Sequence, residues 1–398
     1  MLHPTRLLFL TATFFCGLAF AFMFPLVSLY LVDEIGTSPL VMGLFLTSMV
    51  LSSIVVSAYI GKKSDQGWRR KRIILVAQVS YALAMLVFIF TRDLAFAFAA
   101  AIVLLSVSGA TLPQIFTMGR LYADRDIKTG GSLFMSLMRA GIAVAWVVGP
   151  PLAFLAKEHF GFNVAFSLSL ISALLMVAIV MLLPEVQATE HAEDSATVIK
   201  GWYRNRPMVL FLLSTALMFS AINMYINSIP LYLAKELAVG SHWAGYFMGL
   251  AAFFEIPFMV LAGLLGPKLG NKRLMVVGLG FGTAFFIGLL LADSVAQLLF
   301  LQLFNGVYVA IIACLGMLLA QDLMKREMGM ATTLFNGAQQ VSMLIGNLTV
   351  GLVAQFLSYY AIFYVCVAVT LVALLLLLLV KEEPPLRQTA TPECAPAG

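Results

Sequence analysis

The 398-residue sequence is poor in charged residues. Lys, Arg, Asp and Glu together make up 11% of the chain, whereas an ordinary soluble domain carries about 25%. Hydrophobic residues make up 62% of the chain, and the mean hydropathy is +0.99. So few charges cannot keep a chain of this length dissolved in water, and disordered chains are polar. The composition therefore excludes a soluble or disordered protein, and most of the chain must lie in lipid.

Cysteine and histidine are scarce as well. The sequence has four of each, with no CxxC pair and no HExxH grouping, so it predicts neither a disulfide framework nor a metal site. It also lacks a Walker loop, a catalytic set and a soluble output domain. We therefore expect no metal, no cofactor and no enzymatic activity, and a non-transporting sensor is disfavoured for the same reason.

Long apolar runs dominate what is present. A spanning helix needs about 20 largely apolar residues, and a scan with that window predicts an all-α membrane protein with twelve transmembrane helices. The first run is too long for the apolar core of a signal peptide, so we interpret it as a retained helix. The predicted spans are 7–32, 40–60, 73–90, 96–118, 132–155, 163–183, 207–233, 242–265, 274–291, 296–320, 330–355 and 360–380.

The basic residues predict the orientation. With the N-terminus in the cytoplasm, 20 of the 24 Lys and Arg residues fall on the cytoplasmic side, and only Arg92, Lys157 and Lys235 fall on the other. This asymmetry is typical of an inner-membrane protein with both termini inside. It also explains the net charge of +5 without nucleic acid, because the basic side faces the anionic inner leaflet.

The chain divides into two similar parts. We predict an N-terminal six-helix half over 1–183, a cytoplasmic linker over 184–206, a C-terminal six-helix half over 207–383 and a disordered tail over 384–398. Short segments recur at an offset of about 200 residues: Leu29–Leu31 with Leu231–Leu233, Gly43 with Gly245, and Ser132–Phe134 with Thr333–Phe335. Such a repeat is typical of secondary transporters, which bind substrate near the midplane between their halves.

Two charged residues lie inside predicted spans. Arg139 in span five and Glu255 in span eight have opposite charge and similar depth, roughly 12–15 Å from the cytoplasmic ends. A charge in hydrocarbon is costly and usually functional. The pair could be a structural ion pair between the halves. Alternatively it binds substrate, and a substrate that separates the two residues would change the protonation of Glu255, which is our candidate for proton coupling.

Neutral polar residues cluster in spans four, seven, ten and eleven. The amides that we single out as candidate substrate ligands are Gln114, Asn223, Asn227, Asn305, Asn336 and Gln340. Amides with few charges suit a neutral, hydroxyl-rich ligand, whereas a lipophilic cation would favour several acids and an aromatic cage. Each amide taken singly could instead link helices by hydrogen bonds.

The loop between spans two and three carries a recognisable motif. Its residues Gly61, Asp65, Gly67, Arg69, Arg70 and Lys71 resemble the signature loop of the major facilitator superfamily. That resemblance implies the major facilitator fold of two six-helix halves and a loop that gates access by exchanging ion pairs. The second half keeps only a remnant, Gly266–Arg273, without the aspartate.

A closer resemblance is to the bacterial sugar efflux transporters. It rests on Ser64–Lys71, Leu112–Gln114, Met138–Ala140, Ala145–Phe154, Glu255–Pro257, Leu301–Asn305, Gly316–Leu318, Gln321–Met324 and Ala331–Phe335. By analogy with the superfamily's lactose importer, the resemblance implies that Arg139 and Glu255 hold sugar hydroxyls and that Trp146 stacks on a pyranose face.

We therefore expect a secondary active exporter of neutral sugars such as lactose, glucose and related glycosides or thiogalactosides. The resemblance implies proton antiport by alternating access in the bacterial inner membrane. The expected partners are a small sugar, protons and the lipid bilayer, with the protein as a monomer. The alternative within the same superfamily is a multidrug/proton antiporter.

Overall fold

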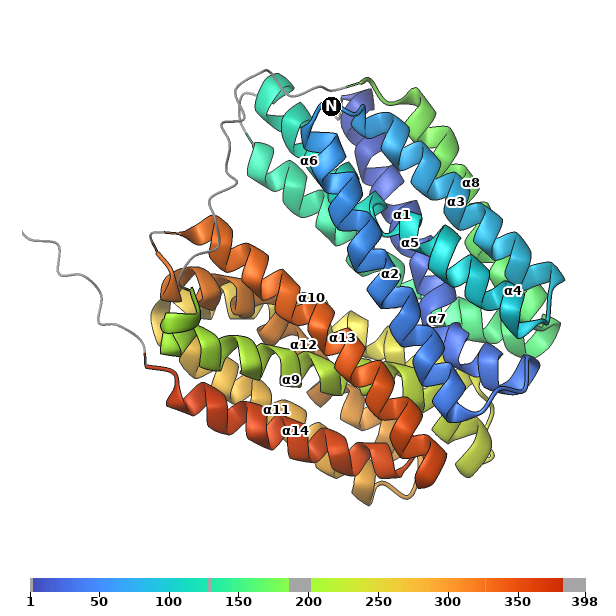
Figure 1. Ribbon diagram of the computed structural model, residues 1–398. Helices are drawn as coiled ribbons and strands as arrows, with labels where there is room; N and C mark the ends of the chain where they lie inside the picture. The colour runs from blue at the N-terminus through green and yellow to red at the C-terminus, as the bar shows by residue number, and fades with distance from the viewer. Residues whose placement is uncertain (1–2, 128–129, 186–201, 326, 382–398) are drawn as a thin grey trace, which may run out of the picture.

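The structure is a computed structural model, and it describes residues 3–127, 130–185, 202–325 and 327–381. These residues form helices and connecting turns, with no strand among them. Figure 1 shows two helical bundles, one built from the blue to green half of the chain and one from the yellow-green to red half. The predicted tail over 384–398 and most of the predicted linker lie outside the described residues.

The first bundle holds the first six membrane-length segments. Its elements are α1 (Pro4–Leu29), the π-helical turn η1 (Tyr30–Glu34), α2 (Pro39–Asp65), α3 (Arg70–Phe90), α4 (Leu94–Ala99), the π-helical η2 (Ala100–Leu105), α5 (Ser106–Ser108), α6 (Thr111–Asp126), α7 (Gly131–Phe160) and α8 (Phe162–Leu182).

The second bundle follows a short 3-10 turn. Its elements are η3 (Trp202–Arg204), α9 (Arg206–Leu231), the π-helical turn η4 (Tyr232–Glu236), α10 (His242–Leu269), α11 (Asn271–Leu291), α12 (Val295–Leu323), α13 (Met328–Phe356) and α14 (Ala361–Leu379).

The prediction of an all-α, twelve-span membrane protein is confirmed. Eleven segments of the described chain are long and apolar enough to cross a membrane, and α13 is a twelfth helix of 29 residues. Amides such as Asn336 and Gln340 make α13 more polar than the others. Most observed helices extend beyond the predicted spans, because polar helix ends reach past the hydrocarbon and were not scored as apolar.

Two spans differ from a simple rod. Span five continues through Pro150 and Pro151 as one helix, α7, although proline removes a backbone hydrogen bond. Span four is broken at Gly109, between α5 and α6. A Cβ atom there would come within 2.0 Å of Ser53 Oγ and 2.9 Å of Ser57 Oγ, so a larger residue at this position would have to displace the serine side chains of α2.

The internal repeat is visible in three dimensions. Tyr30 and Tyr232 begin equivalent π-helical turns at the ends of spans one and seven. Lys71 donates to the carbonyls of Met181 and Leu183 at the end of α8, and Lys272 donates to carbonyls at the end of α14. Lysine at a helix C-terminus satisfies carbonyls that have no intrahelical partner and complements the helix dipole.

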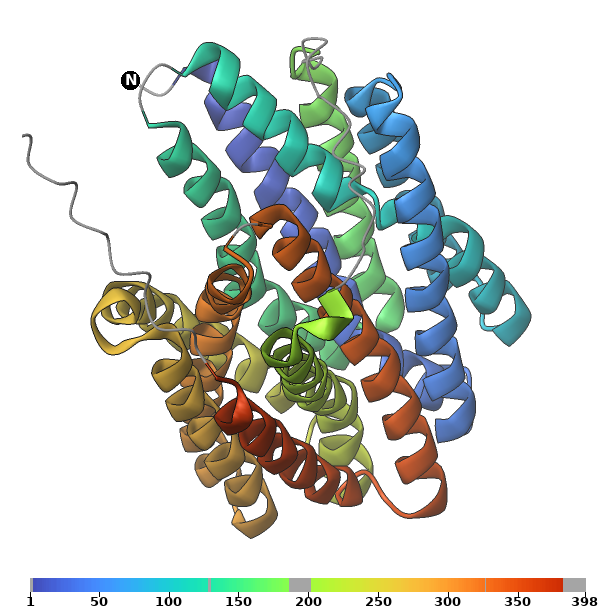
Figure 2. The ribbon, with the colours of Figure 1, turned by 60° about the vertical axis from the view of Figure 1, so that its left-hand side comes forward.

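The two bundles meet along two equivalent seams. Helix α2 lies against α13, and α7 lies against α10. Figure 2 shows the first seam as the blue and orange helices that run side by side. At the seams the backbones touch: a Cβ at Gly43 would lie 2.6 Å from Gly351 Cα, and one at Gly245 would lie 2.7 Å from Pro150 O.

The seams lie at one end of the molecule, which we call the closed end. The opposite end, which we call the open end, carries the start of α1 and the loop over 61–71. In Figure 1 the bundles diverge towards this end. Within the described residues, every hydrogen bond and ion pair between the bundles lies at the closed end.

The close contact at Gly245 predicts a specific sensitivity. Gly245→Leu should lower the thermal unfolding midpoint in detergent by several degrees, because overpacking a tight contact costs about 1–3 kcal/mol. Gly280→Leu is the matched control, since no atom lies within 4 Å of a Cβ built at Gly280. Equal midpoints for the two variants would show that the α7–α10 contact contributes nothing to stability.

Candidate substrate site between the two halves

Arg139 lies on the inner face of α7. The large exposed apolar residues of this helix, among them Leu137, Val144 and Val148, share the outer face. At 3.6 residues per turn, Arg139 lies roughly opposite that face, and Trp146, seven residues on, lies within about 20° of Arg139. Both side chains therefore project into the space between the bundles. Arg139 is exposed there, and Trp146 is half-buried.

Glu255 has the equivalent placement on α10. The exposed residues Phe253, Val260 and Leu264 mark the outer face of the helix. Glu255 lies on the opposite side, between the strip that contacts α7 through Gly245 and Gly249 and the strip that contacts α12 at Gly306. Its side chain is half-buried.

The contacts between α7 and α10 give the relative height of Arg139 and Glu255. Gly245 faces Pro150 and Phe154, and Gly249 faces Val147 and Pro151, so the helices run antiparallel. Continuing this register places Glu255 within about one helical turn of Arg139, ~5 Å along the helix axis. The two residues that the sequence singled out are therefore at nearly the same depth on neighbouring helices.

Arg139 and Glu255 do not form an ion pair in this conformation. No salt bridge within 4.0 Å joins them in the described part of the chain. The Arg139 guanidinium instead lies over the Phe116 ring of α6, 5.9 Å from its centroid. Their charges thus remain available to a polar molecule placed between the halves.

A cavity of about 190 Å³ lies beside this space, between α1, α2, the break in span four and α13. Ser53, Ser57 and Ser108 supply hydroxyl groups, and Gln340 reaches in from the second bundle. Asn336 is exposed one turn from Gln340 on the same helix. We did not single out these serines from the sequence; the four-residue spacing of Ser53 and Ser57 on span two was the available signal.

Three other residues that we predicted to bind substrate form hydrogen bonds within the second bundle. Asn223 donates to Phe219 O and Ser342 Oγ, and Asn227 donates to Asn347 Oδ1 at 2.8 Å. Asn305 donates to Gln302 Oε1 at 3.2 Å, and Tyr225 donates to the same oxygen. The Asn223–Ser342 and Asn227–Asn347 bonds link α9 to α13, and the Tyr225–Gln302 bond links α9 to α12, as in the interhelical alternative that the sequence left open. The bond of Asn305 stays within α12.

Gln114 of α6 contacts the loop over 61–71, which we call the gating loop. Its Oε1 accepts from Ser64 Oγ at 2.9 Å and from Arg70 Nη1 at 3.0 Å. Arg70 also pairs with Asp65 at 3.0 Å, and Gly67 turns the chain with φ of 104°. Gln114 is buried beneath this network, so it does not face the space that contains Arg139 and Glu255.

One ion pair and one histidine–carboxylate contact join the bundles at the closed end. Lys235 Nζ lies 2.6 Å from Asp33 Oδ1, and His242 Nδ1 lies 3.0 Å from Glu158 Oε1. Glu158 also accepts from the His242 backbone N–H at 3.1 Å. We call these two pairs the closed-end pairs. The site is thus open towards one end of the molecule and sealed at the other.

Twelve helices in two repeated halves around a central polar space match a known family. The model described as Major Facilitator Superfamily matches residues 9–295 and 211–396. The chain belongs to the major facilitator superfamily. A solved structure of the nucleoside transporter NupG has the same fold, with a TM-score of 0.78 at 15% identity over 94% of this chain and 98% of that one.

Curated relatives place this transporter among the sugar efflux transporters. Sugar efflux transporter A of Escherichia coli is 37% identical over 377 residues, which are 94% of this chain and 95% of that protein. Sugar efflux transporter B of Salmonella typhimurium is 33% identical over 95% of this chain and 96% of its own length. The stated resemblance is therefore confirmed, and the chain is a multi-pass membrane transporter rather than an enzyme.

The two kinds of amide predict different mutational effects. Asn347→Ala in this transporter should lower the free energy of unfolding by roughly 1 kcal/mol, because it leaves the half-buried amide of Asn227 without its interhelical partner. Asn336→Ala should leave stability unchanged, because Asn336 is exposed to the central space. Thermal unfolding of the two purified variants measures the difference, and equal loss of stability would contradict the separation into two classes.

Proposed function

We propose that this transporter exports neutral sugars, such as lactose, glucose and related glycosides or thiogalactosides, by proton antiport with alternating access. The observation that carries the proposal is the placement of Arg139 and Glu255, unpaired, at one depth on the inner faces of α7 and α10. The naming of relatives at 33–37% identity as sugar efflux transporters supports the substrate class.

The basic residues support the direction of transport. The open end carries the gating loop and the start of α1, and most Lys and Arg residues lie in segments that meet at this end. We therefore assign the open end to the cytoplasm of a bacterial cell, with both termini inside and the protein in the inner membrane. This conformation is then inward-facing, the state that takes up sugar from the cytoplasm.

The chemistry of the central space suits a saccharide. The guanidinium of Arg139 offers five planar donors for hydroxyl oxygens, Trp146 offers an aromatic face, and Gln340 and Asn336 both donate and accept. Ser53 and Ser57 extend the polar lining into the adjoining cavity. A lipophilic cation would instead favour several acids and an aromatic cage, which is why the multidrug alternative is the weaker one.

Glu255 is our candidate for the proton-coupling group. A carboxylate in a membrane span is costly unless it is neutralised, and Glu255 has no cation within 4.0 Å among the described residues. A sugar between Arg139 and Glu255 changes the surroundings of the carboxyl group and so links sugar binding to proton binding. The proton taken up from outside then returns the empty carrier to the inward-facing state.

Alternating access requires the closed end to open. The closed-end pairs join the two halves and must break when the outward-facing state forms, while the gating loop would close the cytoplasmic end. The Gly43 and Gly245 contacts let the same helices approach closely in one state and separate in the other.

Transport by Glu255→Gln tests the coupling directly. Everted vesicles with an acidic lumen should accumulate labelled lactose or a thiogalactoside through the wild-type protein. Glu255→Gln should reduce this accumulation at least tenfold, because the amide cannot carry the proton, while sugar exchange at equal pH continues. Asp293→Asn, a surface acid at a helix connection, is the control and should transport normally.

Undiminished gradient-driven accumulation by Glu255→Gln would remove Glu255 from coupling. Arg139→Ala should raise the KM for sugar roughly 10–100-fold, the loss expected for charge-assisted hydrogen bonds of about 1.5–3 kcal/mol. Absence of sugar transport together with resistance to lipophilic cations would favour the multidrug alternative.

The closed-end pairs predict a shift in access. Thr333 is exposed on the same face of α13 as Gln340, so a cysteine at position 333 in a cysteine-free background should react with an impermeant maleimide from the cytoplasmic side. Lys235→Gln weakens the closed end, populates the outward-facing state and should slow this labelling severalfold.

The matched control is Arg92→Gln. The Arg92–Glu34 pair is also 2.6 Å long and lies at the same end, but both residues belong to the first bundle. Its loss should leave labelling at position 333 unchanged. Equal slowing by Arg92→Gln and Lys235→Gln would show that the effect does not come from separating the halves.

A further inference from the structure

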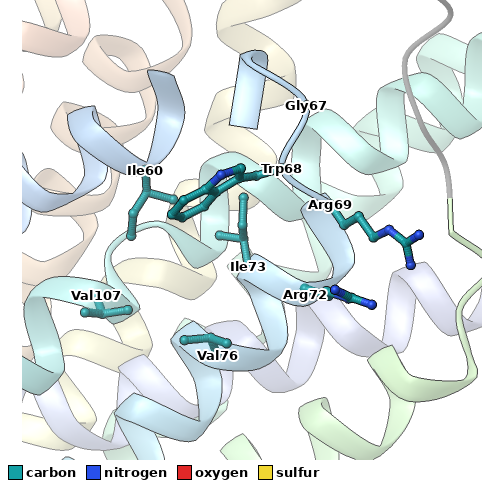
Figure 3. A pocket seen from close by; sticks show the side chains of 8 residues that line it. All are labelled: Ile60, Gly67, Trp68, Arg69, Arg72, Ile73, Val76 and Val107. Carbon is teal, nitrogen blue, oxygen red and sulfur yellow. The ribbon is translucent and has the colours of Figure 1, made fainter. Parts of the chain in front are cut away.

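A groove lies on the outside of the first bundle, away from the central space. Its volume is about 470 Å³, and it runs between α2 and α3 at the open end, with α5 behind it. Figure 3 shows its lining residues, which are Ile60, Gly67, Trp68, Arg69, Arg72, Ile73, Val76 and Val107. The groove therefore combines two arginines with an apolar wall.

Four consecutive basic residues, Arg69 to Arg72, stand at the end of the gating loop and at the start of α3, and they divide into two pairs. Arg70 is held by Asp65 and Gln114, and Lys71 by the carbonyls at the end of α8. Arg69 and Arg72 line the groove instead. Setting the orientation needs only positive charge on this side, so it does not account for two arginines that lie next to each other at the edge of one groove, with both guanidinium groups on the same side of its apolar wall.

Arg69 and Arg72 form few polar contacts with other described residues. Arg69 makes one contact of 3.6 Å with Glu185, with both side chains partly exposed. Arg72 has no hydrogen bond or ion pair with any described residue, and it is exposed. Two guanidinium groups that face the same groove repel one another unless an anion lies between them, so the charge favours a negatively charged ligand.

The rest of the groove is apolar and faces lipid. Ile60 and Ile73 form its floor and pack on Val107. Val76 follows Arg72 by one turn on the same face of α3 and is 61% exposed, and Trp68 is 51% exposed. Trp beside arginines is typical of the membrane interface, so the groove passes from charged headgroup level into hydrocarbon.

We propose that this groove binds one anionic phospholipid. Arg69 and Arg72 hold the phosphate, and an acyl chain lies along Ile73, Val76 and Val107. Inorganic phosphate would use the arginines but would leave the apolar wall uncovered, whereas a zwitterionic lipid would leave an excess of positive charge. Basic pockets between membrane helices on the cytoplasmic side are a known setting for anionic lipids.

Occupancy of the groove would act on the gating loop. Arg69 and Gly67 belong to that loop, and Arg72 lies in the first turn of α3, which begins at Arg70. A bound lipid therefore fixes the turn between α2 and α3 from its outer side, while Gln114 holds Arg70 from its inner side.

Native mass spectrometry of the full-length protein in detergent tests the site. We expect the wild-type protein to retain one dioleoyl phosphatidylglycerol and to retain dioleoyl phosphatidylcholine at least fivefold less. The double variant Arg69→Gln/Arg72→Gln should lose at least four-fifths of the bound phosphatidylglycerol. Lys268→Gln/Arg273→Gln removes the same charge from the corresponding loop of the second bundle and should retain it.

Three results would overturn the proposal. Equal retention of phosphatidylcholine would show that charge does not select the lipid, and displacement of phosphatidylglycerol by equimolar glycerol phosphate would show that the apolar wall is not used. Wild-type retention by the double variant would place the lipid elsewhere. If the double variant does not fold, Arg72→Gln alone, which breaks no hydrogen bond or ion pair with a described residue, should still reduce retention at least twofold.

Discussion

Hydrocarbon offers no hydrogen bonds, and this constraint organises the whole molecule. Every backbone group in a span must be satisfied within its helix, and every polar side chain must find either a protein partner or water. Asn227, Asn347 and Gln302 meet the requirement by bonding across helices. Arg139, Asn336 and Gln340 meet it by facing the space between the bundles. The difference between these two groups defines the candidate site.

Contacts between the halves are built from small residues rather than large ones. Apolar side chains gain little from meeting each other in lipid, because the acyl chains are as apolar as they are. Gly43, Gly245 and Gly351 let backbones come into van der Waals contact instead. Such a seam holds by close fit and can be separated without exposing a large apolar surface to water. A carrier that opens alternately at two ends needs contacts of this kind.

The sequence predicted the span number and pointed to the two charged residues of the candidate site for the same reason. Both follow from the cost of placing charge in lipid, which is readable residue by residue: twelve apolar runs, and Arg139 and Glu255 as the exceptions. The helix ends could not be located as well, because they lie in water, where apolarity does not define them.

The roles of the individual amides could be distinguished only from the structure. Gln114 and Gln340 are the same residue type in similar surroundings along the chain, yet Gln114 accepts from Ser64 and Arg70 while Gln340 lines a cavity. Periodicity gives the face of a helix but not the neighbour that the face meets. For the same reason the sequence indicated the gating loop but not that its arginines point to different sides, nor that Ser53 and Ser57 lie opposite Gln340.

Asp33 and Lys235, which form a closed-end pair, occupy equivalent positions in the two repeats, one within each π-helical turn. A symmetric assembly of two copies of the first half would set aspartate against aspartate there, and two copies of the second would set lysine against lysine. Each half therefore recognises the other and repels itself. The chain carries within a single polypeptide the complementarity of a heterodimer, which favours intramolecular pairing of its halves over exchange with a neighbouring molecule.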